Sequence, residues 1–360
     1  MTMNFPKIKD GHRPVRLSNG KIRIGGSTFG TAAFLNDPNG RLWEVLSFFD
    51  GMHSCDEIIR LIMLKYPDQD VSELRKCVYT IASSPYVEND KEDTWVDSVR
   101  YSRSTILYQW MDMTQREHKW TIQEKISSTS VAVLGVGGVG SYLAMNLAQK
   151  GYKKLLLADY DTVEISNLNR QLFNETDVGD SKIAALKRRI KSFNSSVEVE
   201  TLQANLENPT MLDDIFSMFD CVAISADSTI NIRFEANKAA LKYKTPWVQG
   251  GYQGPEIITG MYDPQEPGCY ACMHQSRLSN PEFSVLEMWN ENTIAPRKNA
   301  ANATTTMLSA ALLSNEIDSL VTGVPDWERN TEYWLNLISF DARKITLDIN
   351  EVCNLCGGGA

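Results

Sequence analysis

The sequence predicts an α/β protein with a Rossmann-like, mostly parallel sheet that carries helices on both faces, plus a small N-terminal winged-helix-like α+β domain. Three observations support this class. Apolar, strand-like runs alternate with helical segments between residues 129 and 262. The first run, Ser130–Leu134, enters a helix through a glycine-rich turn. Residues 1–95 instead combine short alternating runs with three short helical segments.

Composition and charge narrow the class of protein. The 360 residues are 42% hydrophobic and 22% charged, which is typical of a globular protein long enough for two domains. The chain has no apolar run of roughly 18 residues, and its N-terminus lacks the apolar segment of a secretory signal. A net charge of −9 argues against nucleic acid as the main partner, and seven cysteines suit a reducing compartment. We therefore expect a cytoplasmic protein with no membrane or nucleic-acid partner.

Residues 1–95 predict the small N-terminal domain. A hairpin is expected to turn at Asn19–Gly20, and a short strand near Tyr86–Val87 closes the module. Ser54 and Glu57 have the spacing of a helix capping box. The three helices of this domain are expected over 39–50, 57–66 and 73–83.

Residues 96–360 predict the larger domain. Its strands are expected over 130–134, 154–159, 197–202, 220–225 and 246–249. Its helices are expected over 140–150, 181–193, 208–217 and 231–242. Further along, the pattern predicts irregular structure over 263–300, a helix over 301–320, and antiparallel strands over 334–340 and 344–349.

The strand, glycine turn and helix at the start of the larger domain predict a nucleotide site. Glycine permits unusual backbone angles and a close approach of a ligand, and a helix N-terminus attracts phosphate. The next strand ends at Asp159, 24 positions after the first glycine, where such folds place a carboxylate for ribose. The glycines of the turn are Gly135, Gly137, Gly138 and Gly140.

Charged residues downstream favour a triphosphate over a dinucleotide. Arg170 and Lys182 supply cations for a leaving pyrophosphate, and Asp227 supplies a carboxylate for magnesium. The alternatives are ordinary surface ion pairs for the two cations and a helix cap for Asp227. Asp161 is better suited to a structural role.

Two Cys-x-x-Cys pairs predict a structural zinc site. The pairs lie 84 residues apart, and four thiolates would close a tetrahedral site with no open position. Two disulfides or free thiols are the alternatives. The four residues are Cys269, Cys272, Cys353 and Cys356. The remaining cysteines, Cys55, Cys77 and Cys221, lie in apolar surroundings and are expected in the core.

Several of these residues belong to sequence blocks of a known family. The blocks are Gly-x-Gly-Gly-x-Gly at 135–140, Asp-x-Asp-x-Val-x-x-Ser-Asn-Leu-Asn-Arg-Gln at 159–171, Val-Gly-x-x-Lys at 178–182 and Ser-Ala-Asp at 225–227. In this order they resemble the ThiF and ubiquitin-activating family of adenylating enzymes over roughly residues 100–356.

The resemblance implies a role for each matching residue. Asp159 would hold the ribose hydroxyls, and Asp227 would bind magnesium. The phosphates would be contacted by Asn167, Arg170 and Lys182. Arg103 matches an arginine that reaches ATP in the partner subunit, which implies a homodimer, although Ser104 replaces the usual glutamine.

The N-terminal domain resembles the PqqD-like peptide-recognition domains, in which a leader peptide adds a strand to the wing. The resemblance rests on the pattern Phe34-Leu-Asn36, Gly40, Leu42-Trp43, Leu46, Phe49-Asp-Gly51 and Glu57-Ile58. A purely structural winged helix without a ligand is the alternative.

The fusion of these two domains resembles the microcin C-type and pantocin-type peptide-maturation enzymes. It implies ATP-dependent adenylation of a C-terminal or side-chain carboxylate of a ribosomally made precursor peptide, with release of pyrophosphate. The alternatives are an activator of a sulfur-carrier or ubiquitin-like protein, a tRNA-modifying dehydratase, and an inactive peptide-binding scaffold. Residues 275–300 contain no cysteine, which argues against a transthiolation cycle. His118 and His274 are candidate general bases.

Overall fold

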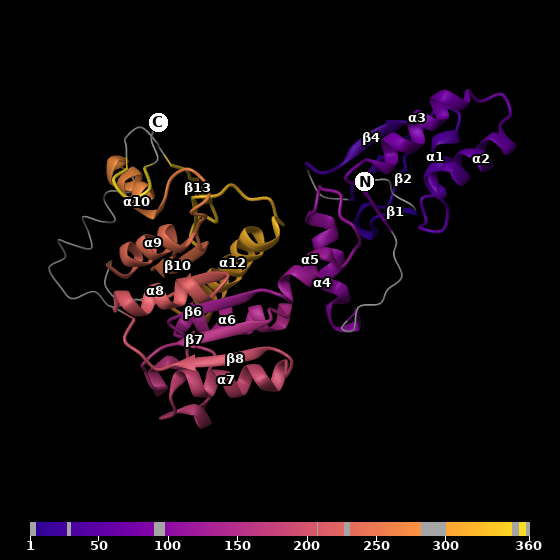
Figure 1. Ribbon diagram of the computed structural model, residues 1–360. Coiled ribbons are helices and arrows are strands. Elements are labelled where there is room, and N and C mark those ends of the chain that lie inside the picture. Colours follow the sequence, from indigo (N-terminus) through magenta and orange to yellow (C-terminus); the bar gives the residue numbers. More distant parts are fainter. Residues whose placement is uncertain are drawn as a thin grey trace. The chain divides into compact units, whose positions relative to one another are not determined.

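The structure is a computed structural model that describes residues 5–26, 30–89, 98–206, 208–226, 231–281, 300–347 and 353–357. The chain divides into two compact units, residues 1–125 and residues 126–360, and Figure 1 labels many of their helices and strands. Among the described residues, no helix combines the length and the apolar composition needed to cross a lipid bilayer.

The larger unit is built on one sheet whose described strands run in the order β13-β12-β11-β10-β9-β6-β7-β8. The strands β6 (Ser130–Leu134), β7 (Lys154–Ala158), β8 (Glu198–Leu202), β9 (Cys221–Ile224) and β10 (Trp247–Gln253) are parallel. The strands β11 (Glu256–Tyr262), β12 (Thr331–Asn336) and β13 (Ala342–Ile345) extend the sheet in antiparallel fashion. The apolar runs of the central strands are buried, as expected for parallel strands covered on both faces.

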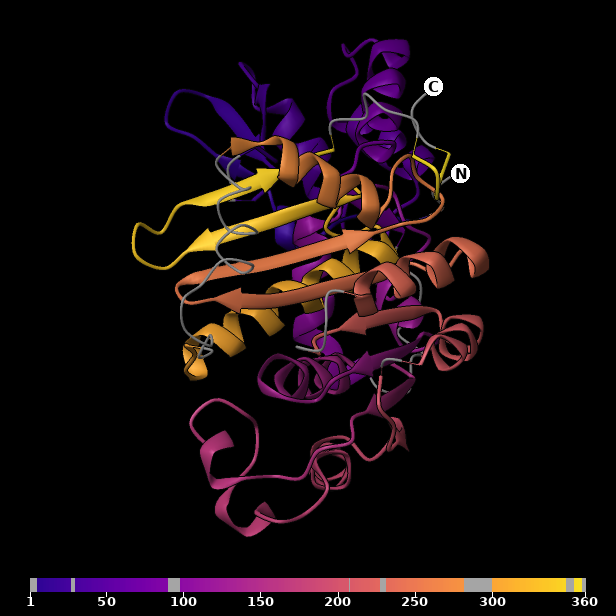
Figure 2. The ribbon, with the colours of Figure 1, turned by 90° about the vertical axis from the view of Figure 1, so that its left-hand side faces the viewer.

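Helices cover both faces of this sheet, which confirms the predicted class. Figure 2 shows α9 and α10 in front of the strands and α12 behind them. The front layer comprises α8 (Pro209–Met218), α9 (Asn231–Tyr243) and α10 (Tyr270–Ser279), and its apolar side chains pack with Trp247 and Tyr262 in the core. The other layer comprises α6 (Gly138–Lys150), α7 (Lys182–Phe193) and α12 (Ala303–Thr322).

The prediction of irregular structure over 263–300 was wrong for Tyr270–Ser279, which form α10. The ring of Tyr270 packs against Trp247 and Tyr262, with ring centroids 5.7 and 5.6 Å apart. Strand β11 was not predicted, because Thr259 and Gly260 interrupt its apolar pattern. The last two described strands begin two to three residues earlier than the sequence pattern indicated.

The smaller unit contains the predicted α+β elements. The strands β2 (Val15–Arg16), β3 (Lys21–Ile24) and β4 (Ala33–Asn36) form an antiparallel sheet, and β1 (Pro6–Ile8) pairs with β5 (Val87–Asn89). The helices α1 (Arg41–Ser47), α2 (Cys55–Lys65) and α3 (Val71–Ala82) pack with these strands around a shared apolar core. The capping box is present, because the Glu57 amide donates to Ser54 Oγ and the Ser54 amide to Glu57 Oε2.

Helix α4 (Ser98–Met111) packs within the smaller unit, and α5 (Thr121–Ile126) follows it at the division between the units. Buried polar contacts hold the end of α4. The Lys9 ammonium donates to the carbonyls of Asp112 and Thr114, both at 2.8 Å, and the Gln109 amide donates to the Glu88 carboxylate. The domain boundary expected after residue 95 therefore precedes a helix that packs with the N-terminal residues.

Candidate functional site

A cavity of about 620 Å³ opens at the carboxyl ends of the parallel strands. Strand β6 lies between β7 and β9, so the chain leaves β6 toward one side of the sheet and later returns on the other. Ligands of open α/β sheets bind at such a switch point. The lining comes from the loops after β6, β7, β8 and β9 and from the end of β10.

The glycine turn shapes the floor of the cavity. A Cβ on Gly135, whose φ is +85°, would lie 2.8 Å from the backbone of Ala226, and a Cβ on Gly140 would lie 1.9 Å from the Gly135 oxygen. These two glycines therefore allow the turn to pack against its neighbours. A Cβ on Gly137 would meet nothing closer than Gln171 Nε2 at 3.8 Å, so this glycine leaves its face open to a ligand. Gly135, Gly137 and Gly138 line the cavity, whereas Gly140 lies behind them in α6.

Asp159 follows β7 directly and is held in a fixed orientation. Its Oδ2 accepts the Val136 amide at 2.8 Å, and its Oδ1 accepts the Asp161 amide at 2.9 Å. The side chain is buried but still lines the cavity. Each carboxylate oxygen keeps a further lone pair, so the group can accept hydrogen bonds from ligand hydroxyls.

Two cations face the same cavity. Lys182 begins α7, is only 6% exposed, and places Nζ 2.7 Å from Asp161 Oδ2. It is therefore a buried cation with one carboxylate partner, not an ordinary surface ion pair. Arg170 is half-buried and donates to the Ser166 carbonyl at 2.8 Å. Asn167 is buried beside it, and its Oδ1 accepts the Glu164 amide.

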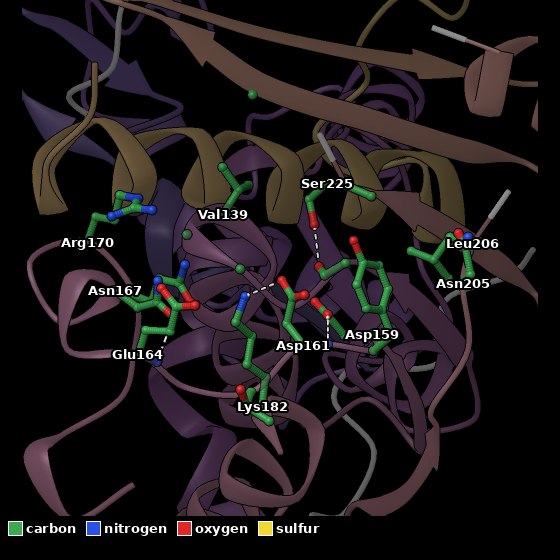
Figure 3. A pocket seen from close by; sticks show the side chains of 18 of the residues that line it. Val139, Asp159, Asp161, Glu164, Asn167, Arg170, Lys182, Asn205, Leu206 and Ser225 are labelled. Carbon is green, nitrogen blue, oxygen red and sulfur yellow. Dashed lines mark hydrogen bonds and ion pairs between the residues drawn. The ribbon is translucent and has the colours of Figure 1, made fainter. Parts of the chain in front are cut away.

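The lining residues divide the cavity into three zones. Figure 3 shows Arg170 and Asn167 at one end, Asn205 and Leu206 at the other, and Asp159 and Asp161 between them. In the first zone Arg170 suits an anionic group, although the Glu164 carboxylate lies there too. In the middle Asp159 suits hydroxyl groups and Lys182 a further anionic group, and a flat, weakly polar group suits the last zone. This order of properties matches a nucleoside phosphate.

Several lining residues were given no role from the sequence, among them Gln171, Asn205, Leu206 and Tyr252. Asn205 and Leu206 come just after β8, and Tyr252 lies near the end of β10. The rule that ligands bind at the carboxyl ends of parallel strands would have pointed to these three. Gln171 closes the long sequence block but was given no role.

The remaining site residues predicted from the sequence are Asp227, Arg103, His118 and His274. Asp227 is outside the described residues. Arg103 is exposed on α4, in the smaller unit. His118 lies in that unit as well, with Nε2 3.4 Å from Glu124, and His274 packs edge-on against the Phe234 ring. Neither histidine lines the cavity.

The four thiols of the two Cys-x-x-Cys pairs converge although they are far apart in the sequence. All four sulfurs lie within 4.8 Å of one another, and none is in a disulfide. Neighbouring sulfurs are 3.8, 3.9 and 3.6 Å apart. A tetrahedral zinc ion with Zn–S bonds of about 2.3 Å separates its sulfurs by about 3.8 Å, so the arrangement fits this ion.

The remaining cysteines are not placed for chemistry. Cys55 and Cys221 are buried, and Cys77 is half-buried. Burial raises the pKa of each of these thiols, which keeps them protonated and unreactive.

A comparison with protein families decides the classification, because a model of the ThiF family matches residues 101–355. The chain belongs to the ThiF family. Ubiquitin-like modifier-activating enzyme 5 of Drosophila grimshawi is 32% identical over 233 residues, which cover 61% of this chain and 55% of that protein. SUMO-activating enzyme subunit 2 of Dictyostelium discoideum is 32% identical over 150 residues, covering 41% of this chain and 22% of that protein. The chain thus spans about half the length, or less, of these ThiF-family relatives.

Solved structures of the same fold cover nearly the whole chain. MccB of E. coli superposes with a TM-score of 0.79 at 21% identity, covering 98% of this chain and 97% of MccB. PaaA superposes with a TM-score of 0.67 at 20% identity, covering 94% of this chain and 99% of PaaA. The likeness includes the smaller unit, so both units share their folds with these ThiF-like proteins.

Proposed function

We propose that this ThiF-family protein uses ATP to adenylate a carboxylate of a ribosomally made peptide. The observation that carries the proposal is the cavity itself, where the glycine turn, Asp159, Arg170 and Lys182 line one space. MccB, the similar protein described above, has been crystallised with ATP. The three zones of the cavity suit the triphosphate, ribose and base of that nucleotide.

In the proposed reaction a carboxylate oxygen of the peptide attacks the α-phosphorus of ATP. A new carbon–oxygen–phosphorus link forms, and the bond from the α-phosphorus to the bridging oxygen breaks, so pyrophosphate leaves with the electron pair. The carboxylate is already ionised at neutral pH, so no general base is required. Catalysis then consists of positioning and charge stabilisation.

Several residues of the cavity would take part in this adenylation. The N-terminus of α6 and the open face of Gly137 would hold the α-phosphoryl group, and Asp159 would accept the ribose hydroxyls. Arg170 and Lys182 would bind the two outer phosphates. Lys182 would exchange its contact with Asp161 for a phosphate oxygen as the triphosphate enters.

Two metal ions belong to the proposal. Magnesium would accompany ATP, and the carboxylate expected for it is Asp227, which lies outside the described residues. Zinc would be structural, because four thiolates fill its coordination sphere and leave no site for a substrate. It would fasten the segment around Cys353 to the start of α10.

The smaller unit would recognise the peptide. MccB has been crystallised with its peptide MccA and with N-formylated MccA. In the smaller unit the sheet order β2-β3-β4 leaves β4 paired on one side only within the described residues, and a peptide strand can add to such an edge. Phe34 on this strand is 60% exposed and would contact the added peptide.

Arg103 would complete the site of a partner subunit in a homodimer. The side chain is exposed on α4, so it is accessible to a second chain. This role comes from the sequence resemblance alone. Its test is the oligomeric state, together with restoration of activity when an Arg103→Ala subunit is mixed with a subunit inactive at Lys182.

A second candidate is an activator of a ubiquitin-like protein. The identity of 32% with ubiquitin-like modifier-activating enzyme 5 favours it. The chain has no cysteine between Cys272 and Cys353, so residues 273–352 cannot supply a thioester.

Mass spectrometry of short candidate peptides incubated with the protein and MgATP tests the proposal. A gain of AMP, or a loss of water after adenylation, supports it. The matched control is the same peptide with every carboxylate blocked as an amide, which should remain unmodified. If only a folded protein with a Gly-Gly end were adenylated, the second candidate would replace the first.

A further inference from the structure

Gln171 places a buried side-chain amide in the cavity. The side chain is 6% exposed and lines the cavity. Its Oε1 is buried without a hydrogen-bond partner among the described residues. We propose that Gln171 binds the α-phosphoryl group of the nucleotide by donating a hydrogen bond from Nε2, a role that rests on the function proposed above.

The position of the amide nitrogen supports this role. Among the described residues other than Gly137 and its two chain neighbours, only Gln171 has an atom within 4 Å of the Cβ that Gly137 would carry, namely Nε2 at 3.8 Å. It therefore faces the one glycine of the turn that leaves space for a ligand. A group bound at that space and at the N-terminus of α6 lies within reach of this donor.

The fold does not need this amide. The Gln171 main chain is held without it, because its amide donates to the Asn167 carbonyl at 2.9 Å and the Leu172 amide donates to Ser141 Oγ at 3.1 Å. On the other side, Thr306 Oγ1 donates to the Arg170 carbonyl at 2.9 Å. A buried amide oxygen without a hydrogen-bond partner destabilises the folded protein. A residue there for packing alone would be apolar.

Because the Gln171 amide is uncharged, it suits the α-phosphoryl group better than it suits the outer phosphates. Arg170 and Lys182 are the cations of the lining, and they suit the pyrophosphate that leaves with added negative charge. The α-phosphoryl group keeps one negative charge both in ATP and in the acyl-adenylate. A neutral donor can hold it before and after the reaction without trapping the product.

The test compares Gln171→Leu and Gln171→Glu with Lys182→Met as the matched control. Calorimetry would measure the binding of ATP, ADP and AMP to each full-length variant, and thermal unfolding would measure stability without nucleotide. We expect Gln171→Leu to weaken all three nucleotides by about tenfold, the effect of losing one hydrogen bond to a charged group. Its unfolding temperature should equal or exceed that of the wild type.

The control should give a different pattern. Lys182→Met should weaken ATP more than AMP, because AMP lacks the outer phosphates. Gln171→Glu should weaken AMP more than Gln171→Leu does, since it places a carboxylate beside the phosphate. A loss confined to ATP in Gln171→Leu would overturn the assignment to the α-phosphoryl group.

Two further outcomes separate this inference from the proposed function. If the wild type bound ATP and Gln171→Leu bound all three nucleotides equally well, the role of Gln171 would be refuted and the proposed function would stand. If Gln171→Leu lost binding together with a lower unfolding temperature, the amide would be structural and the inference would fail. A wild type that bound no adenine nucleotide would refute the proposed function as well.

Discussion

Replacing Gly140 by alanine tests whether the glycine turn is held by close packing. The added Cβ would lie 1.9 Å from the Gly135 oxygen and 2.5 Å from Ser225 Oγ. Ordinary contacts of a Cβ begin at 3.4 Å, so the backbone of the turn and α6 must separate by about 1.5 Å. The first contact is with a main-chain atom, so no change of rotamer relieves it.

The expected cost follows from this displacement. Overpacking that moves backbone costs about 1–3 kcal/mol, and the central position of β6 and α6 places this case near the upper value. For a unit of this size, about 3 kcal/mol lowers the unfolding temperature by roughly 6–12 °C. We therefore expect a clear destabilisation of Gly140→Ala without any ligand present.

Gly137→Ala is the matched control. Among the described residues that are not its chain neighbours, the new Cβ meets only Gln171 Nε2, at an ordinary contact distance of 3.8 Å. The variant should therefore unfold closer to the wild type than Gly140→Ala does, since it creates no clash. Its methyl group would occupy the ligand face, so ATP binding should fall. Calorimetric scans and ATP titrations measure both effects; equal unfolding temperatures for Gly140→Ala and the wild type would contradict the packing argument.

Three other substitutions test separate features. Cys353→Ser should lower the bound zinc from one ion per chain and make unfolding insensitive to a chelator, as metal analysis and scans would show. Lys182→Met should abolish ATP–pyrophosphate exchange while the variant stays folded; retained exchange would remove this cation from the reaction. Glu316 is fully buried, and burial raises its pKa well above the ordinary value of 4.5. The folded state thus holds this proton more tightly than the unfolded chain, so stability is lost as pH rises above that value. Glu316→Gln should flatten this loss at pH values above 4.5, by up to about 1.4 kcal/mol per pH unit in urea unfolding; parallel curves for both proteins would contradict it.

Local patterns were sufficient to predict the strands and helices that carry the glycine turn. The run at Ser130–Leu134 is apolar because both faces of a central parallel strand are buried, and this signal needs no knowledge of distant residues. The start of α7 is also local, since Ser181 precedes Lys182 as the N-cap residue. The predicted ends of these elements agree with the structure to within about two residues, which is the usual uncertainty of helix ends.

Helix α10 could not be predicted in this way because distant partners hold it. Arg277 on this helix donates to both oxygens of the buried Glu332 carboxylate at 3.0 Å. Cys269, at its N-terminus, joins the cluster that includes Cys353, 84 residues away. A helix held by a buried ion pair and by thiols shows no strong apolar periodicity. Asn205 and Tyr252 carry no motif, and only the rule that ligands bind at the carboxyl ends of parallel strands would have pointed to them.

The attachment of α4 has a consequence for how the proposed activity is tested. Arg103 lies on this helix, and the helix is fixed to the smaller unit by Lys9 and Glu88. Removing residues 1–95 would delete both partners and remove the buried hydrogen bonds of the Asp112 carbonyl and the Gln109 amide. If Arg103 has the role proposed for it, a truncated chain would therefore lose ATP turnover even if the peptide domain had no role in chemistry. Substitution of exposed Phe34 in the full chain avoids this ambiguity, because it alters the edge strand without touching the contacts of α4. If the edge strand binds the peptide, Phe34→Ser should weaken peptide binding and leave ATP binding unchanged, whereas unchanged peptide binding would count against that surface.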